Sequence, residues 1–121
     1  MKTFKTLIVA IIAFFAFREA NAQRDKSQST LCIKTENIKV LGTCSMDKRR
    51  IENAAYSIEG VKSAEWNEYT QILTLKYNVF KKEAADNLQK KIASVGNDTE
   101  KYKADDAVYQ KLPDCCHYRN I

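Results

Sequence analysis

Three short segments of the chain alternate between hydrophobic and polar residues, which is the pattern of strands with one buried face. They are residues 36–41, 61–66 and 72–77. The polar turn at residues 67–70 is short enough to join the last two strands as a hairpin. Residues 98–103 can supply a short fourth strand.

Apolar residues recur at spacings of three and four over residues 47–59 and 82–95, which predicts two amphipathic helices. Gly60 and Gly96 follow them and are the expected stops. A short helix is predicted over residues 105–112. The order βαββαβ predicts an α+β, ferredoxin-like sandwich of two helices on one face of a four-stranded sheet, with a short C-terminal helix.

The first 22 residues have the features of a secretory signal peptide. Lys2 and Lys5 precede an apolar run over residues 7–17, and Ala20-Asn21-Ala22 forms a small-x-small cleavage site. The run is shorter than the roughly 20 apolar residues of a transmembrane helix, so cleavage before Gln23 is favoured over an uncleaved anchor. We therefore expect a periplasmic or secreted protein.

Four segments are expected along the chain. They are the signal peptide (1–22), a flexible polar leader (23–35), the folded domain (36–103) and a C-terminal helix with a cysteine-rich tail (104–121). Removing 22 of the 121 residues leaves 99, which is enough for one small domain.

The charge distribution argues against a nucleic-acid-binding protein. The formal charge is +5, of which the signal peptide carries +2, so the mature chain carries +3. Its longest basic block is Lys48-Arg49-Arg50, which is typical of a solvated helix face. The chain has one histidine, no Cys-x-x-Cys pair and no glycine-rich phosphate loop, so nothing in it indicates an enzyme.

The most informative stretch is Thr43-Cys44-Ser45-Met46-Asp47, which joins the first predicted strand to the first predicted helix. Free backbone N–H groups and the helix dipole lower the pKa of a thiol at such a junction. Cys44 can therefore act as a thiolate, the form that binds soft metal ions. Met46 can offer a thioether or pack against the loop.

This stretch and the segments after it resemble the heavy-metal-associated domain found in copper chaperones, metal-pumping ATPases and periplasmic mercury-binding proteins. The matching segments are Thr43-Cys44-x-x-Asp47, Ile51-Glu52-Asn53-Ala54 and Gly60-Val61-Lys62-Ser63-Ala64. Two more segments resemble exported stand-alone members, namely Val95-Gly96-Asn97-Asp98-Thr99-Glu100 and Leu112-Pro113-Asp114-Cys115-Cys116-His117-Tyr118. The resemblance covers residues 36–103 and the tail.

The resemblance implies that thiolates on the loop before the first helix bind copper(I), zinc or mercury(II). It also implies a metal-transporting membrane protein as a partner. Cys44 matches the first cysteine of the family motif, whereas Asp47 stands in place of the second. Asn97 stands in place of a histidine of the exported relatives. These replacements are oxygen donors, which suit soft ions poorly. Asp47 has two possible roles, because an acid at this position can stabilise the first turn of a helix as well as bind an ion.

Cys115, Cys116 and His117 place two sulfurs and an imidazole within three residues. The short tail helix can fold them back toward Cys44 to complete a three- or four-coordinate site. The candidate ligands are therefore these three residues, Cys44 and Asp47.

Two interpretations of the cysteines remain open. In the first, the protein binds a thiophilic ion and passes it on by thiolate exchange. In the second, Cys44 and Cys32 each pair with one tail cysteine, since four cysteines in an exported protein commonly form disulfides. The chain is then a disulfide-stapled ferredoxin-like binding module that no longer binds metal.

Overall fold

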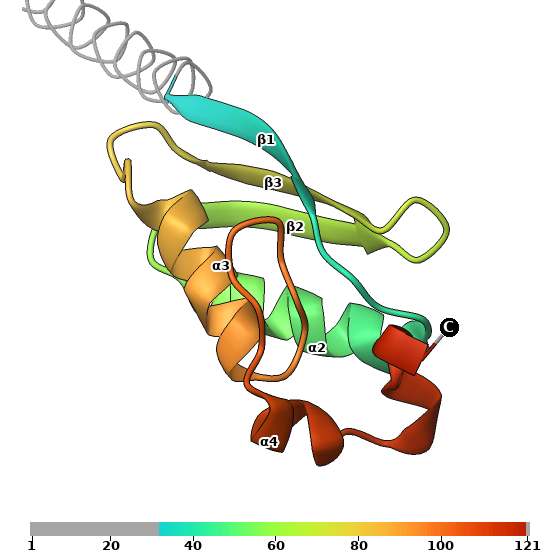
Figure 1. Cartoon of the computed structure of the whole chain (residues 1–121). Coiled ribbons are helices and arrows are strands. Elements are labelled where there is room, and N and C mark those ends of the chain that lie inside the picture. Colours follow the sequence, from blue (N-terminus) through green and yellow to red (C-terminus); the bar gives the residue numbers. More distant parts are fainter. Residues whose placement is uncertain (1–31, 121) are drawn as a thin grey trace, which may run out of the picture. The chain divides into compact units, whose positions relative to one another are not determined.

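The computed structural model describes residues 32–120, so the predicted signal peptide and most of the predicted leader lie outside the described residues. The elements are β1 (Ile33–Lys39), α2 (Ser45–Tyr56), β2 (Val61–Asn67), β3 (Ile72–Asn78), α3 (Ala84–Ser94), α4 (Asp106–Gln110), η1 (Asp114–Cys116) and η2 (Tyr118–Asn120). The predicted α+β class is confirmed (Figure 1). No helix within residues 32–120 is both long and apolar enough to cross a membrane.

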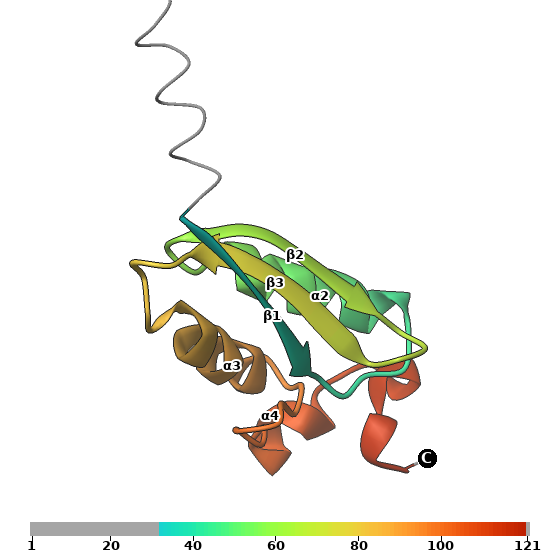
Figure 2. The same ribbon diagram turned by 90° about the horizontal axis from the view of Figure 1, so that it is seen from above.

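One antiparallel sheet is formed by the three strands in the order β1-β3-β2. β2 and β3 form the predicted hairpin, in which Trp66 pairs with Leu73. The helices α2 and α3 lie against the same face of the sheet (Figures 1 and 2). α2 starts at one end of the sheet, directly after the connection from β1 (Figure 1).

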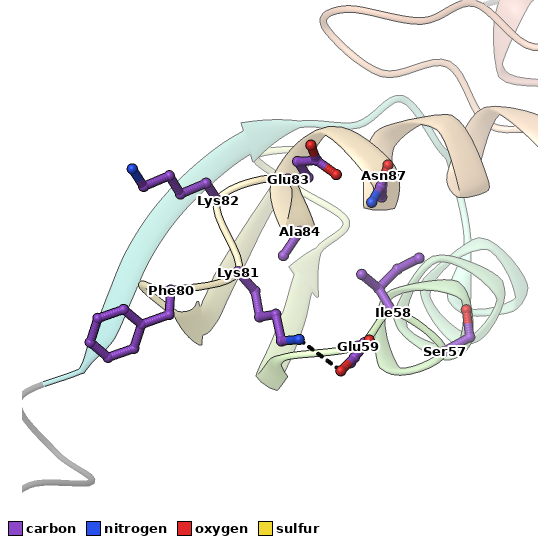
Figure 3. Close-up of a pocket in the computed structure, with 9 residues that line it drawn as sticks. All are labelled: Ser57, Ile58, Glu59, Phe80, Lys81, Lys82, Glu83, Ala84 and Asn87. Atoms are coloured by element: carbon purple, nitrogen blue, oxygen red, sulfur yellow. Dashed lines mark hydrogen bonds and ion pairs between the residues drawn. The ribbon is translucent and has the colours of Figure 1, made fainter.

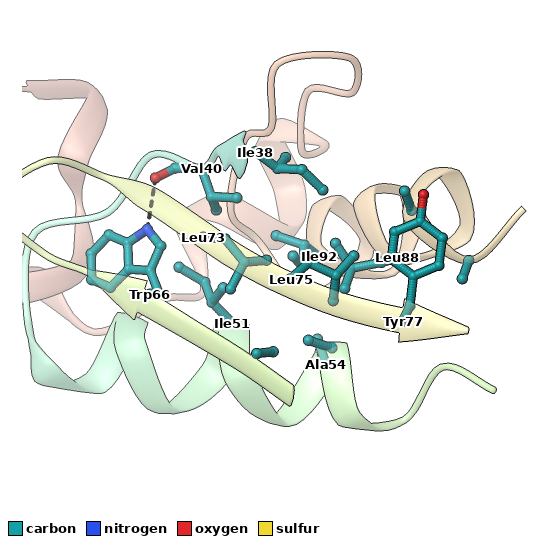
Figure 4. Packing of buried hydrophobic residues seen from close by; sticks show 14 residues of the cluster. Ile38, Val40, Ile51, Ala54, Trp66, Leu73, Leu75, Tyr77, Leu88 and Ile92 are labelled. Atoms are coloured by element: carbon teal, nitrogen blue, oxygen red, sulfur yellow. Dashed lines mark hydrogen bonds between the residues drawn. The ribbon is translucent and has the colours of Figure 1, made fainter. Parts of the chain in front are cut away.

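The alternation of the strands produces the hydrophobic core between the sheet and the helices (Figure 4). Its largest fully buried side chains are Trp66, Ile38, Ile51, Leu73, Leu75, Leu88 and Ile92. The indole N–H of Trp66 donates to the Val40 carbonyl at 3.0 Å. A Cβ atom at Gly42 would lie 2.9 Å from the indole ring, so glycine allows the β1–α2 connection to pass directly over Trp66.

The predicted fourth strand over residues 98–103 is wrong. This segment makes a single isolated bridge just after β1, between Val40 and Thr99. The Thr99 N–H donates to the Tyr102 carbonyl at 2.8 Å, and the Asp98 carboxylate accepts the N–H of Ala104 at 2.7 Å. These local bonds hold the segment as a loop, because they use backbone groups that a strand would present to β1.

Several element boundaries differ from the predictions by a few residues. β1 begins at Ile33, inside the segment predicted as leader, and α2 ends at Tyr56. Gly60 therefore does not end α2 but lies in the turn before β2, with a φ of 91°. Gly96 is the predicted stop of α3, with a φ of 112°, and a Cβ atom there would lie 2.9 Å from Leu112 of the tail.

Candidate metal centre

Cys44 is the N-cap residue of α2. Its backbone is extended (φ −148°, ψ 173°), and its side chain makes no capping hydrogen bond. Burial opposes ionisation of the thiol, but the backbone N–H groups of Asp47 and Met46 and the thiol of Cys116 favour it. Their combined effect holds the pKa of Cys44 below its ordinary value, as its place at a strand–helix junction predicted.

The tail of the chain carries two more thiols back to this loop. Pro113 precedes η1, and η1 places Cys115 and Cys116 beside the β1–α2 connection (Figures 1 and 2). The hydroxyl of Thr43 donates to the Cys115 carbonyl at 2.6 Å. This bond joins two segments that are 72 residues apart in the sequence.

The three sulfurs form a nearly equilateral triangle. Cys44 Sγ lies 3.3 Å from Cys116 Sγ and 3.9 Å from Cys115 Sγ, and the two tail sulfurs are 3.8 Å apart. Metal–sulfur bonds of about 2.3 Å separate the sulfurs of a trigonal or tetrahedral site by roughly 3.8–4.0 Å. The triangle therefore fits one thiophilic ion with little movement of the side chains.

The three thiols differ in their exposure. Cys115 is exposed, Cys44 is half-buried and Cys116 is fully buried. Burial raises the pKa of Cys116 to about 12, Arg50 opposes this increase, and the nearby Cys44 and Asp47 add to it. The guanidinium Nη2 of Arg50 lies 3.6 Å from Cys116 Sγ. Cys116 is therefore a neutral thiol near pH 7 until a cation displaces its proton.

Asp47 is fully buried, and its Oδ2 lies 3.7 Å from Cys44 Sγ. One carboxylate oxygen accepts the Thr43 N–H at 2.8 Å, and the other accepts Arg50 Nη1 at 2.7 Å and Asn97 Nδ2 at 3.0 Å. As the third residue of α2 it reaches back to the preceding loop, in the manner of the acid in a capping box. Asp47, one of the predicted ligands, therefore holds the loop that carries Cys44 in position.

The two positions that depart from the family pattern contact each other. Asn97 is fully buried, and its amide donates to Asp47 and also to the Leu41 carbonyl at 2.9 Å. Its side-chain oxygen accepts Arg50 Nη1 at 3.3 Å. Asp47 and Asn97 thus form one hydrogen-bonded network with Arg50, and this network supports the loop from beneath.

Replacing Asp47 with cysteine, the residue that the resemblance to heavy-metal-associated domains would place there, is expected to damage this network. Asp47→Cys leaves Arg50, the Thr43 N–H and the Asn97 amide without their acceptor, so we expect the free energy of unfolding to fall by about 3 kcal/mol. Urea unfolding of the reduced, metal-free protein measures this change. Glu68→Cys, which replaces an exposed acid in the β2–β3 turn, is the matched control. A variant Asp47→Cys as stable as the wild type would contradict the supporting role of Asp47.

His117 is not brought to the sulfurs. Within residues 32–120, the ligand atoms that lie within 4.8 Å of one another are the sulfurs of Cys44, Cys115 and Cys116. The ring of His117 packs on Tyr109 instead, with 5.1 Å between the ring centroids, and its Nε2 is buried without a hydrogen-bond partner. The sequence placed His117 within three residues of both thiols, but the turn after η1 directs its ring toward α4.

A cluster of bonds that the sequence did not indicate holds the tail in place. We call Asp98, Tyr118 and Arg119 the tail latch. Arg119 donates from Nη2 and Nε to the two oxygens of Asp98 at 2.7 and 3.0 Å. The Tyr118 hydroxyl accepts the Asp98 N–H at 2.8 Å and donates to the Gly96 carbonyl at 2.8 Å. The latch holds η2, and thereby the preceding cysteines, against the α3–α4 connection.

A cleft without soft metal ligands lies at the other end of α2. This cleft of about 440 Å³ opens between the C-terminal end of α2 and the start of α3, and the ion pair of Lys81 Nζ with Glu59 at 2.8 Å crosses it (Figure 3). Its lining residues include no cysteine or histidine. The 12 residues of α2 separate this cleft from Cys44 by about 18 Å, so it is not part of the metal centre.

Solved structures with a similar fold include CopZ and MerP. The CopZ metallochaperone is 28% identical, with a TM-score of 0.51 over 55% of this chain and 98% of that protein. Oxidized MerP from Ralstonia metallidurans CH34 is 23% identical, with a TM-score of 0.52 over 56% of this chain and 94% of that protein. No protein-family model and no curated protein sequence matches the chain.

Proposed function

The chain has the fold of heavy-metal-associated domains, and we propose that it binds one thiophilic metal ion and transfers it by exchange of thiolate ligands. The ligands are Cys44, Cys115 and Cys116. The observation that carries this proposal is the sulfur triangle with sides of 3.3 to 3.9 Å. The similar CopZ is described as a metallochaperone, which supports a carrier and not an enzyme.

The exposure of the three thiols suggests how the ion is exchanged. Cys115 is exposed, so an incoming ion or a partner's thiolate reaches it first. Cys116 is fully buried beside Arg50, whose charge stabilises the thiolate that forms when the ion displaces the proton. Cys44 and Cys116 therefore retain the ion while the bond to Cys115 is exchanged.

The cargo in this proposal is copper(I), zinc or mercury(II), all of which bind thiolates. The signal-peptide pattern of residues 1–22 supports a periplasmic or secreted protein. A metal-transporting membrane protein is the proposed partner, because it supplies or accepts the ion at the membrane.

Ion binding is expected to strengthen as the pH rises. The pKa of Cys116 is raised to about 12, so this thiol is protonated across the neutral range and each bound ion releases its proton. The apparent affinity should therefore increase about tenfold per pH unit for each proton released. Competition with a chromophoric chelator of known pH dependence, between pH 6 and 8, measures this slope. An affinity independent of pH would contradict binding by Cys116.

The alternative is a disulfide-stapled binding module without metal. The four cysteines at positions 32, 44, 115 and 116 are free in the structure, as a thiolate carrier requires. Native mass spectrometry of the protein purified from the cell envelope and then reduced and offered copper(I) or zinc without oxygen tests both. The carrier predicts one retained ion, whereas the alternative predicts a mass short by four hydrogens before reduction and no ion afterward.

A further inference from the structure

One sulfur beside the triangle has no role in the site described so far. Met46 is the second residue of α2, and its thioether sulfur lies 3.6 Å from Cys115 Sγ. This separation lies within the range of the thiol separations, which are 3.3 to 3.9 Å. Met46 is 48% exposed, so packing into the core does not account for its position.

The other potential donors near the triangle either accept hydrogen bonds or are not brought to the sulfurs. Both oxygens of Asp47 accept hydrogen bonds from Thr43, Arg50 and Asn97. The ring of His117 packs against Tyr109, and its nitrogens are not among the ligand atoms that lie within 4.8 Å of one another at the triangle. The donor that remains beside the exposed thiol of the triangle is therefore a thioether and not an oxygen or a nitrogen.

We propose that Met46 is the fourth ligand of the ion, which completes a site made entirely of sulfur. This inference rests on the proposed function, because a fourth ligand requires an ion at the three thiolates. A methionine side chain has three rotatable bonds, so Met46 can turn its sulfur from Cys115 toward an ion bound at the triangle. It lies next to Cys115, so it keeps the ion bound on the exposed side when a partner's thiolate replaces that cysteine.

A thioether ligand also discriminates between ions. Thioether sulfur is a soft, uncharged donor that suits copper(I), whereas zinc sites in proteins are built from thiolate, imidazole and carboxylate. Met46 therefore raises the affinity of the site for copper(I) and leaves its affinity for zinc nearly unchanged.

X-ray absorption of the full chain labelled with selenomethionine tests this assignment. Met1 is the only other methionine in the sequence, so Met46→Leu, labelled in the same way, is the matched control. With one equivalent of copper(I), we expect a copper–selenium scattering path in the wild type and none in Met46→Leu. Chelator competition should show about a tenfold loss of copper(I) affinity in Met46→Leu, with zinc affinity retained.

The outcomes separate this inference from the proposed function. Copper bound at one ion per wild-type chain without a copper–selenium path would overturn the role of Met46 and leave the three-thiolate carrier intact. An equal loss of copper(I) and zinc affinity in Met46→Leu would also overturn it. Failure of the wild type to retain any copper would overturn the carrier, and the role of Met46 with it. The copper–selenium path is measured in the wild type, so this test does not depend on how the variant folds.

Discussion

Replacing Cys116 with serine is expected to reduce the affinity for copper(I) by more than about 100-fold. Loss of a partner that only supports a ligand typically costs 10- to 100-fold, and Cys116→Ser removes a ligand itself. Serine keeps the size of the side chain at this fully buried position, so the fold should persist. Competition with a copper(I) chelator measures the affinity, and circular dichroism checks the fold.

Cys32→Ser is the matched control for this substitution. Cys32 directly precedes β1 and is not part of the group of three thiols, so its loss should leave the affinity unchanged. If Cys32→Ser weakened binding as much as Cys116→Ser, the ion would be bound by a different set of cysteines. An unchanged affinity in Cys116→Ser would remove the tail from the site.

Replacing Arg119 with glutamine is expected to weaken ion binding by about 10- to 100-fold although every cysteine remains. Arg119 forms the centre of the tail latch, and its guanidinium also stacks on Tyr109 at 4.3 Å from the ring centroid. Without it, Asp98, which is 8% exposed, loses its cationic partner. The docked state of the tail should become less stable, relative to the undocked state, by about 3 kcal/mol. An undocked tail presents its thiols to Cys44 at a lower effective concentration.

Arg49→Gln is the matched control for Arg119→Gln. Arg49 is exposed on α2, and no ion pair joins it to another residue of the described chain. Binding should weaken in Arg119→Gln alone, while circular dichroism shows that both variants keep their helices and sheet. An affinity of Arg119→Gln equal to that of the wild type would mean that the tail docks without the latch.

The sequence was sufficient to predict the elements that depend on local patterns. The spacing of Ile51, Ala54 and Ala55 placed α2, and the alternation around Leu73 and Leu75 placed β3, because each pattern reports one buried face. The prediction of a strand over residues 98–103 was wrong because it rested on the local pattern alone. The polar residues of this segment form bonds with their own neighbours, and periodicity carries no information about such bonds.

The site required tertiary information that no local pattern holds. Cys115 and Cys116 were identified as soft ligands from their chemistry, but their approach to Cys44 depends on the latch, in which Asp98 and Arg119 are 21 residues apart. Asp47 and Asn97 looked like two separate losses of a ligand. In the structure they are 50 residues apart in sequence and share a hydrogen bond, so the two residues belong to one supporting network.

Thiol protection provides the most direct test of the three-thiolate site. The reduced full chain, with and without one equivalent of copper(I), is treated briefly with an alkylating reagent, and each modified cysteine is identified by peptide mass spectrometry. We expect the ion to protect Cys44, Cys115 and Cys116 while Cys32 is alkylated in both samples. Alkylation of Cys115 and Cys116 at the metal-free rate, with the ion still bound, would show that the tail does not belong to the site.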